Sequence, residues 1–150
     1  MPTTKPLSNV PIFTVETDPS AELRRTIFDG LFHSNVERTG DGTIEQLCIV
    51  ARDASDSLVG GIYGEIYWGW LHVLALWVAP PSRRQRLGTQ LLARAEGEAS
   101  AKGCRGAYLD TFSFQGIDFY TRAGYQVFGS LPHYPAGHSR HFLRKALNVA

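Results

Sequence analysis

A short basic segment between two apolar stretches carries the side chains best suited to binding a ligand. It joins the end of a predicted buried strand to the start of a predicted helix, so free backbone N–H groups and the helix dipole meet there. Such a helix start binds phosphate, arginines add charge-assisted hydrogen bonds, and a glycine lets a bulky ligand approach closely. The segment consists of Arg83, Arg84, Gln85, Arg86, Leu87, Gly88 and Thr89. The residues alone are compatible with a phosphate site and equally with a solvated basic loop that has a packing glycine.

The patterns on either side of this segment predict the elements that position it. Between residues 46 and 80, β-branched and aromatic residues predict three consecutive strands joined by tight turns. The third, residues 71–78, is apolar on both faces apart from His72, which is typical of a central strand. Residues 87–102 then predict a helix stopped by Gly103, because apolar residues recur four positions apart at Leu87, Leu91, Ala95 and Ala99.

The rest of the chain completes a mixed sheet. Strands are predicted at residues 10–17, 107–111, 125–129 and within 140–147, and helices from the cap residue Ser20 to about Val36 and at 115–123. Because a helix connects the strands at 71–78 and 107–111, those two strands should be parallel. The predicted fold class is therefore α/β (α+β), a mixed central sheet with helices on both faces.

Composition limits the classes of protein that fit. The 150 residues suit a single domain spanning 1–150, with residues 1–9 a loose tail, and 43% hydrophobic and 19% charged residues are typical of a globular chain. A formal charge of +1 gives no net field for binding nucleic acid or an anionic membrane. Cys48 and Cys104 lack metal-site or redox spacing, so we expect reduced, packed thiols and no metal. No signal peptide or membrane span is visible, which favours a cytoplasmic location.

The basic segment and its flanks resemble the GNAT superfamily of acetyltransferases. The family's motif reads Gln or Arg, two variable residues, Gly, one variable residue, then Gly or Ala. Arg83 and Gly88 fill its first and last positions, whereas Arg86 stands in place of the glycine at the fourth. Residues 76–80 look like the family's strand four and its exit, and residues 118–125 are similar to its late helix and turn. The matches follow the family's order over residues 58–129.

This resemblance implies a sheet of about seven strands that is splayed between strands four and five. It also implies transfer of an acetyl group from acetyl-CoA to a primary amine by direct attack in a ternary complex. The pantetheine arm would pair with the strand edge at Leu76 and Val78, and the N–H of Val78 would face the thioester oxygen. Ser113 stands where the family often has an asparagine that binds pantetheine; its hydroxyl, or Gln115, would take that role.

The resemblance also implies candidates for proton transfer. Tyr120 matches a tyrosine that can protonate the departing thiolate, although it can also simply pack against the cofactor. His72 matches the position of a glutamate base in one branch of the family, and a hydrogen-bonded core histidine is the alternative. Glu65 on the preceding strand and Asp110 are further candidates for the base, and Asp110 can instead orient a cationic acceptor.

The acceptor is the least constrained part of the prediction. A set of aromatic residues and histidines has two possible roles. They could line a pocket for a cationic or ring-shaped acceptor, or they could serve cross-strand pairing or a homodimer contact. The residues are Tyr63, Tyr67, Trp68, Trp70, His133, Tyr134 and His138. We expect a small-molecule amine as acceptor. The alternatives are a protein or peptide N-acetyltransferase and a non-catalytic module that binds acyl-CoA.

Overall fold

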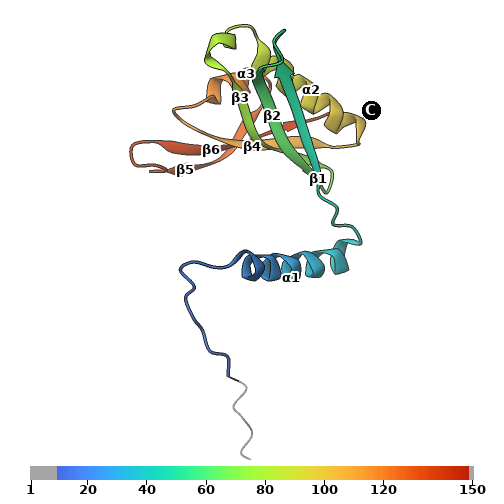
Figure 1. Ribbon diagram of the computed structural model, residues 1–150, viewed down its shortest axis with the longest axis vertical. Helices are drawn as coiled ribbons and strands as arrows, with labels where there is room; N and C mark the ends of the chain where they lie inside the picture. The colour runs from blue at the N-terminus through green and yellow to red at the C-terminus, as the bar shows by residue number, and fades with distance from the viewer. Residues whose placement is uncertain (1–9, 149–150) are drawn as a thin grey trace, which may run out of the picture. The chain divides into compact units, whose positions relative to one another are not determined.

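The computed structural model describes residues 10–148, which divide after Gly40 into two units (Figure 1). The first unit contains helix α1, Ala21–Thr39. The side chain of Ser20 accepts a hydrogen bond from the N–H of Leu23 at 3.0 Å, and Gly40 ends the helix in the left-handed conformation. The predicted cap is therefore confirmed, and the helix continues three residues beyond Val36.

The strand predicted at residues 10–17 is not formed. This segment has no regular secondary structure, so the sheet has six strands within residues 10–148 instead of about seven. A β-branched composition makes a strand only where a partner accepts its hydrogen bonds. The described residues of the first unit contain no strand with which this segment could pair, and Pro11 has no N–H to donate.

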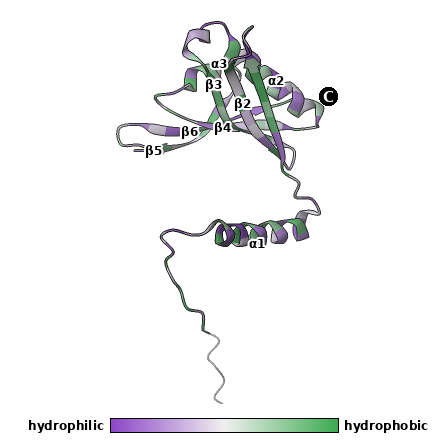
Figure 2. Ribbon diagram, viewed as in Figure 1, coloured by the Kyte–Doolittle hydropathy of each residue, from purple (hydrophilic) through white to green (hydrophobic). Residues whose placement is uncertain are grey.

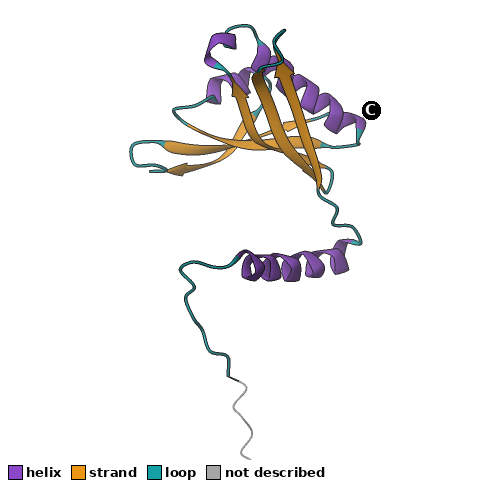
Figure 3. Ribbon diagram, viewed as in Figure 1, coloured by secondary structure: helices purple, strands orange, loops and turns teal. Residues whose placement is uncertain are grey.

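The second unit is a mixed sheet with two α-helices (Figure 3). The spatial order of its strands is β1-β2-β3-β4-β6-β5, with β3 and β4 parallel as predicted and every other pair antiparallel. Along the chain the elements are β1 Glu45–Arg52, β2 Leu58–Tyr67, β3 Trp70–Val78, the 3₁₀ turn Pro80–Ser82, α2 Leu87–Ala101, β4 Gly106–Phe112, α3 Ile117–Arg122, β5 Gln126–Pro132 and β6 Ser139–Ala146.

Helix α2 supplies one wall of the core and packs against β1, β2 and β3. The predicted apolar face of the helix is confirmed, since Leu91, Ala95 and Ala99 are buried. Figure 2 shows the run of hydrophobic residues along β3. The buried hydrophobic residues are Ile62, Leu71, Val73, Leu91, Leu92, Ala95, Ala99, Cys104, Ala107, Leu109, Tyr125 and Leu143.

The two cysteines differ in their environment. Cys104 is fully buried beside α2, whereas Cys48 is exposed on β1. The prediction of two packed thiols is thus wrong for Cys48. Its neighbours Leu47 and Ile49 pack against the core, and the alternation of a strand turns Cys48 to the other face. Within residues 10–148, no helix is long and apolar enough to cross a membrane.

Two irregularities in β3 open the sheet at its centre. The register between β2 and β3 shifts between Tyr63 and Gly64, which leaves Leu74 as the extra residue of a β-bulge. The pairing of β3 with β4 covers only three residues and ends at His72 opposite Tyr108. Beyond this point the two strands diverge, as the family resemblance predicted.

Candidate active site

The basic turn before α2 folds into a conformation that leaves its N–H groups free. Arg84 and Arg86 both have positive φ, 74° and 58°, and Arg86 is the N-cap of the helix without a side-chain cap. The first helical N–H groups, from Leu87 to Thr89, have no intrahelical acceptor. These three residues line a pocket at the positive end of the helix dipole, which suits a phosphate.

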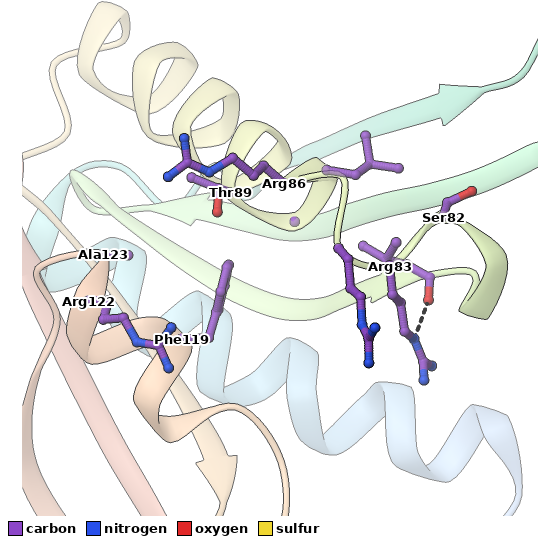
Figure 4. Close-up of a pocket in the computed structure, with 11 residues that line it drawn as sticks. Ser82, Arg83, Arg86, Thr89, Phe119, Arg122 and Ala123 are labelled. Carbon is purple, nitrogen blue, oxygen red and sulfur yellow. Dashed lines mark hydrogen bonds between the residues drawn. The ribbon is translucent and has the colours of Figure 1, made fainter.

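The turn lines an outer pocket with a volume of about 500 Å³. Figure 4 shows that Arg83 and Arg86 come from the turn, while Phe119 and Arg122 come from α3. The Nε of Arg83 donates to the carbonyl of Val78 at 3.1 Å, which ties the turn to the end of β3. The residues lining the pocket are Val78, Ser82, Arg83, Arg84, Arg86, Leu87, Gly88, Thr89, Phe119, Arg122 and Ala123.

Sequence reasoning missed Arg122 and included one residue that does not line the pocket. Arg122 lies two residues after Tyr120 in the short helix α3, and no charge pattern in the sequence linked it to the distant basic turn. Gln85 is exposed and is not part of the pocket wall. Four arginines therefore surround the site, three from the turn and one from α3.

Gly88 faces the pocket with space to spare. A Cβ built at this position would lie 3.5 Å from the ring of Phe119 and 3.7 Å from Val78, which are ordinary contacts. The packing of the protein itself therefore does not require glycine here. A methyl group would instead occupy the volume in which a ligand meets the helix.

An inner cavity of about 290 Å³ continues from the outer pocket into the gap between β3 and β4. Both cavities share Val78, Gly88 and Phe119, so they adjoin, and together they form a cleft from the turn to the splay. The inner cavity is lined by Leu76, Val78, Gly88, Asp110, Thr111, Gln115, Gly116, Phe119 and Tyr120. The structure thus brings together Leu76, Val78, Tyr120 and the turn, as predicted.

The edge of β3 presents backbone N–H groups to this cavity. Ala79 donates to the carbonyl of Val59 at 2.8 Å, so the neighbouring pair, Gly60 opposite Val78, is of the non-hydrogen-bonded kind. The N–H of Val78 consequently points away from β2, and so does that of Leu76 two residues earlier. Because β4 has already diverged, both N–H groups face the open cleft.

Tyr120 projects from α3 into the inner cavity. Its ring packs edge to face with Phe119 and Tyr125, at centroid distances of 5.0 and 5.9 Å. Burial, assisted by the negative charge of Asp110, raises the pKa of the Tyr120 hydroxyl above its usual value. The phenol is therefore protonated at neutral pH and can donate its proton.

Ser113 does not lie where the resemblance placed it. Its hydroxyl accepts a hydrogen bond from the N–H of Ser139 at 3.1 Å, and it does not line either part of the cleft. Gln115 does line the inner cavity, and its Oε1 accepts from the N–H of Phe112 at 3.0 Å. Of the two alternatives, only Gln115 lies at the cleft.

His72 and Glu65 lie together where the splay begins. They face each other across β2 and β3, and the imidazole stacks on Tyr108 with a centroid distance of 4.3 Å. Burial lowers the pKa of His72, while the nearby carboxylates of Asp110 and Glu65 oppose that shift. The ring is therefore neutral at pH 7 and able to accept a proton.

Asp110 is engaged with an arginine that sequence reasoning did not single out. The Nε of Arg140 donates to Oδ2 of Asp110 at 2.6 Å, and Nη1 of Arg140 donates to the hydroxyl of Tyr134 at 3.1 Å. The predicted aromatic residues are dispersed, since Tyr67 stacks on Trp68 at the β2–β3 turn and Tyr134 instead contacts Arg140. No sequence spacing links Asp110 to Arg140, because β6 reaches β4 only through the sheet.

Comparison with known proteins agrees with this geometry. The model of the acetyltransferase (GNAT) family matches residues 13–125. A blasticidin-S acetyltransferase of Streptomyces morookaense is 45% identical over 60% of this chain and 67% of its own length. An acetyltransferase of Agrobacterium fabrum is 36% identical over 89% of this chain and 97% of its own. The crystal structure of an acetyltransferase from Bacillus cereus superposes with a TM-score of 0.82 at 33% identity, covering 89% of this chain and 98% of that one.

Proposed function

The chain belongs to the GNAT family of acetyltransferases, and we propose that it transfers the acetyl group of acetyl-CoA to the amine of a small molecule by direct attack. The observation that supports this proposal is the pair of adjoining cavities, which extend from the basic turn before α2 to an open strand edge beside Tyr120. The similarity to a blasticidin-S acetyltransferase supports a small-molecule acceptor.

The residues of the cleft fit coenzyme A from end to end. The N–H groups of the turn, with Arg83, Arg84, Arg86 and Arg122 around them, would hold the pyrophosphate. The N–H groups of Leu76 and Val78 would pair with the pantetheine arm and hydrogen-bond the thioester oxygen. Coenzyme A supplies the activated thioester, and the protein supplies position and hydrogen-bond donors.

One of these strand N–H groups acts where negative charge develops during the attack. A thioester oxygen gains negative charge as the amine adds to its carbonyl carbon, and a fixed backbone donor stabilises that charge. Both Leu76 and Val78 are held in place by the pairing of β3 with β2. This donor therefore needs no reorganisation and no particular side chain.

Tyr120 is the proposed acid. The phenol lies in the inner cavity with a raised pKa, so it carries a proton to give to the departing thiolate. Tyr120→Phe keeps the ring packing against Phe119 and removes only the hydroxyl. We expect kcat to fall about 10²-fold or more while the affinity for acetyl-CoA, measured by calorimetry, changes little.

His72 and Glu65 are the proposed route for the proton of the acceptor amine. An amine with a pKa near 10 is mostly protonated at neutral pH and must lose a proton before it attacks. A neutral imidazole with a carboxylate opposite it can accept that proton, directly or through water. Asp110 is less suited to this role than its place in the cleft suggests, because Arg140 neutralises it.

Initial-rate kinetics test the direct transfer. With acetyl-CoA varied at several amine concentrations, the ternary-complex mechanism gives intersecting double-reciprocal lines. Parallel lines together with an acetylated enzyme would instead show a covalent intermediate. Neither cysteine lines the cleft, so a Cys48→Ser, Cys104→Ser protein should keep the intersecting pattern.

A further inference from the structure

We propose that Arg140 binds a carboxylate on the acceptor, so that the preferred substrates are amines that also carry this anionic group. The inference rests on the proposed function and adds to it the substrate class. It follows from the way in which the guanidinium is held, from its place beside the cleft and from the charges around it.

The guanidinium is fixed but not saturated. Asp110 accepts from Nε and Tyr134 accepts from Nη1, while the rings of Phe112, Tyr134 and Phe142 lie 5.3–5.5 Å from the guanidinium carbon. Nη2 has no hydrogen-bond partner among residues 10–148. The side chain is 28% exposed, so part of it is open to a ligand. A preorganised guanidinium loses little entropy on binding a carboxylate, whose planar geometry it matches.

Arg140 lies at the mouth of the splay. Pairing of β3 with β4 ends at Tyr108, and Asp110 follows two residues later, within the wall of the inner cavity. Arg140 is paired with Phe112 in β6, next to the pair formed by Phe142 and Asp110. Directly paired residues share a sheet face, so these side chains gather on one face, opposite the buried Leu109. Arg140 is thus one contact away from the cavity that holds Tyr120.

The two ends of this sheet face carry different charges. Glu65 and His72 lie at the β2–β3 end, where a carboxylate attracts the acceptor's ammonium group. At the β6 end, Arg140 already pairs with Asp110 and lies over the aromatic rings. A second cation would have to compete with Arg140 for these groups. The free donors of Nη2 favour an anion there. An acceptor with an amine at one end and a carboxylate at the other satisfies both ends.

Matched pairs of acceptors test this inference. The probes are ω-amino acids of three to six carbons and their carboxamides, assayed for thiol release from acetyl-CoA. The same pairs are titrated by calorimetry into the complex of the enzyme with coenzyme A, which gives a readout independent of turnover. We expect the wild type to prefer the carboxylate member of at least one pair about tenfold or more, in kcat/KM or in affinity.

Arginine variants link the preference to Arg140. Arg140→Gln should reduce the ratio of carboxylate to carboxamide about tenfold, and Arg140→Lys should retain part of it. The comparison between variant and wild type cancels differences in amine basicity. Arg144→Gln is the matched control, because Arg144 lies four residues along the same face of β6 and contacts Phe128 instead. Its ratio should equal that of the wild type.

The possible results separate this inference from the proposed function. Turnover of both members without a carboxylate preference would overturn the role of Arg140 and leave the acetyltransferase intact. A preference that survives Arg140→Gln would also overturn it. If Arg140→Gln fails to fold, as judged by thermal unfolding, Tyr134→Phe removes the hydroxyl that holds Nη1, and it should lower the ratio two- to fivefold. An unchanged ratio in a folded Tyr134→Phe protein together with an unchanged ratio in Arg140→Lys would reject the proposal.

Discussion

Replacing Arg86 with glycine or alanine separates the two contributions of this residue to the basic turn before α2. The backbone at Arg86 is left-handed, with φ 58° and ψ 20°, a region that glycine occupies freely and other residues do not. Its guanidinium lines the outer pocket. Both variants lose the guanidinium, but only glycine relieves the backbone strain.

The expected magnitudes follow from these two features. A left-handed residue other than glycine costs about 1–2 kcal/mol, and the greater freedom of glycine in the unfolded chain offsets about 0.5–1 kcal/mol of that. Arg86→Gly should therefore be more stable than Arg86→Ala by about 1 kcal/mol. Loss of one exposed charge-assisted contact to a phosphate should weaken binding of coenzyme A about fivefold in both variants.

Urea unfolding and calorimetric titration with coenzyme A measure the two effects independently. Arg94→Ala is the control, because it removes one positive charge from the helix that Arg86 caps, and Arg94 does not line the cleft. Equal stability of the glycine and alanine variants would refute the left-handed backbone at this position. Unchanged affinity in both variants would refute the contact between Arg86 and a phosphate.

Three further predictions concern the cleft and the core. Gly88→Ala should not lower the free energy of unfolding, because the methyl group meets only ordinary contacts with Phe119 and favours the helix, but it should weaken binding of coenzyme A at least fivefold, as calorimetry would show. In the pH profile of kcat, activity should fall on the acidic side below pH 6.5, because burial lowers the pKa of His72 from that value. His72→Gln should abolish this fall, and a fall that persists in the variant would exclude His72 as the base. Lys145→Met should cost roughly 2 kcal/mol in urea unfolding, because it leaves Glu96, whose side chain is 11% exposed, without the ammonium group that lies 2.7 Å away. Adding Glu96→Gln to Lys145→Met should restore most of the lost free energy of unfolding. If it restores none, the loss does not come from the unpaired carboxylate of Glu96.

Local signals in the sequence were sufficient for most of the second unit. The recurrence of Leu91, Ala95 and Ala99 identified the buried face of α2, and Gly103 marked its end. The order of strand, helix and strand around the basic turn predicted the parallel pair of β3 and β4. These features depend on residues close together in the chain, where periodicity and capping act directly.

Features that depend on contacts between residues far apart in the chain could not be predicted from local sequence patterns. Residues 10–17 have the composition of a strand but do not form one, because pairing decides whether an extended segment becomes part of a sheet. Arg122 lines the same pocket as the basic turn, and Arg140 pairs with Asp110, only after folding brings separate segments together. Ser113, unlike Gln115, does not line the cleft. Its hydroxyl instead accepts a hydrogen bond from the N–H of Ser139, which lies 26 residues away in the chain.

Acetyl transfer to an amine is tested by measuring thiol release from acetyl-CoA for the wild-type protein with a panel of amines that includes blasticidin S. We expect release that depends on both the enzyme and an amine, with an N-acetylated product detected by mass spectrometry. Tyr120→Phe should slow this release about 10²-fold or more without loss of coenzyme A binding. Tight binding of coenzyme A with no amine-dependent release from any member of the panel would contradict acetyl transfer to a small-molecule amine and indicate a module that binds the cofactor without catalysis.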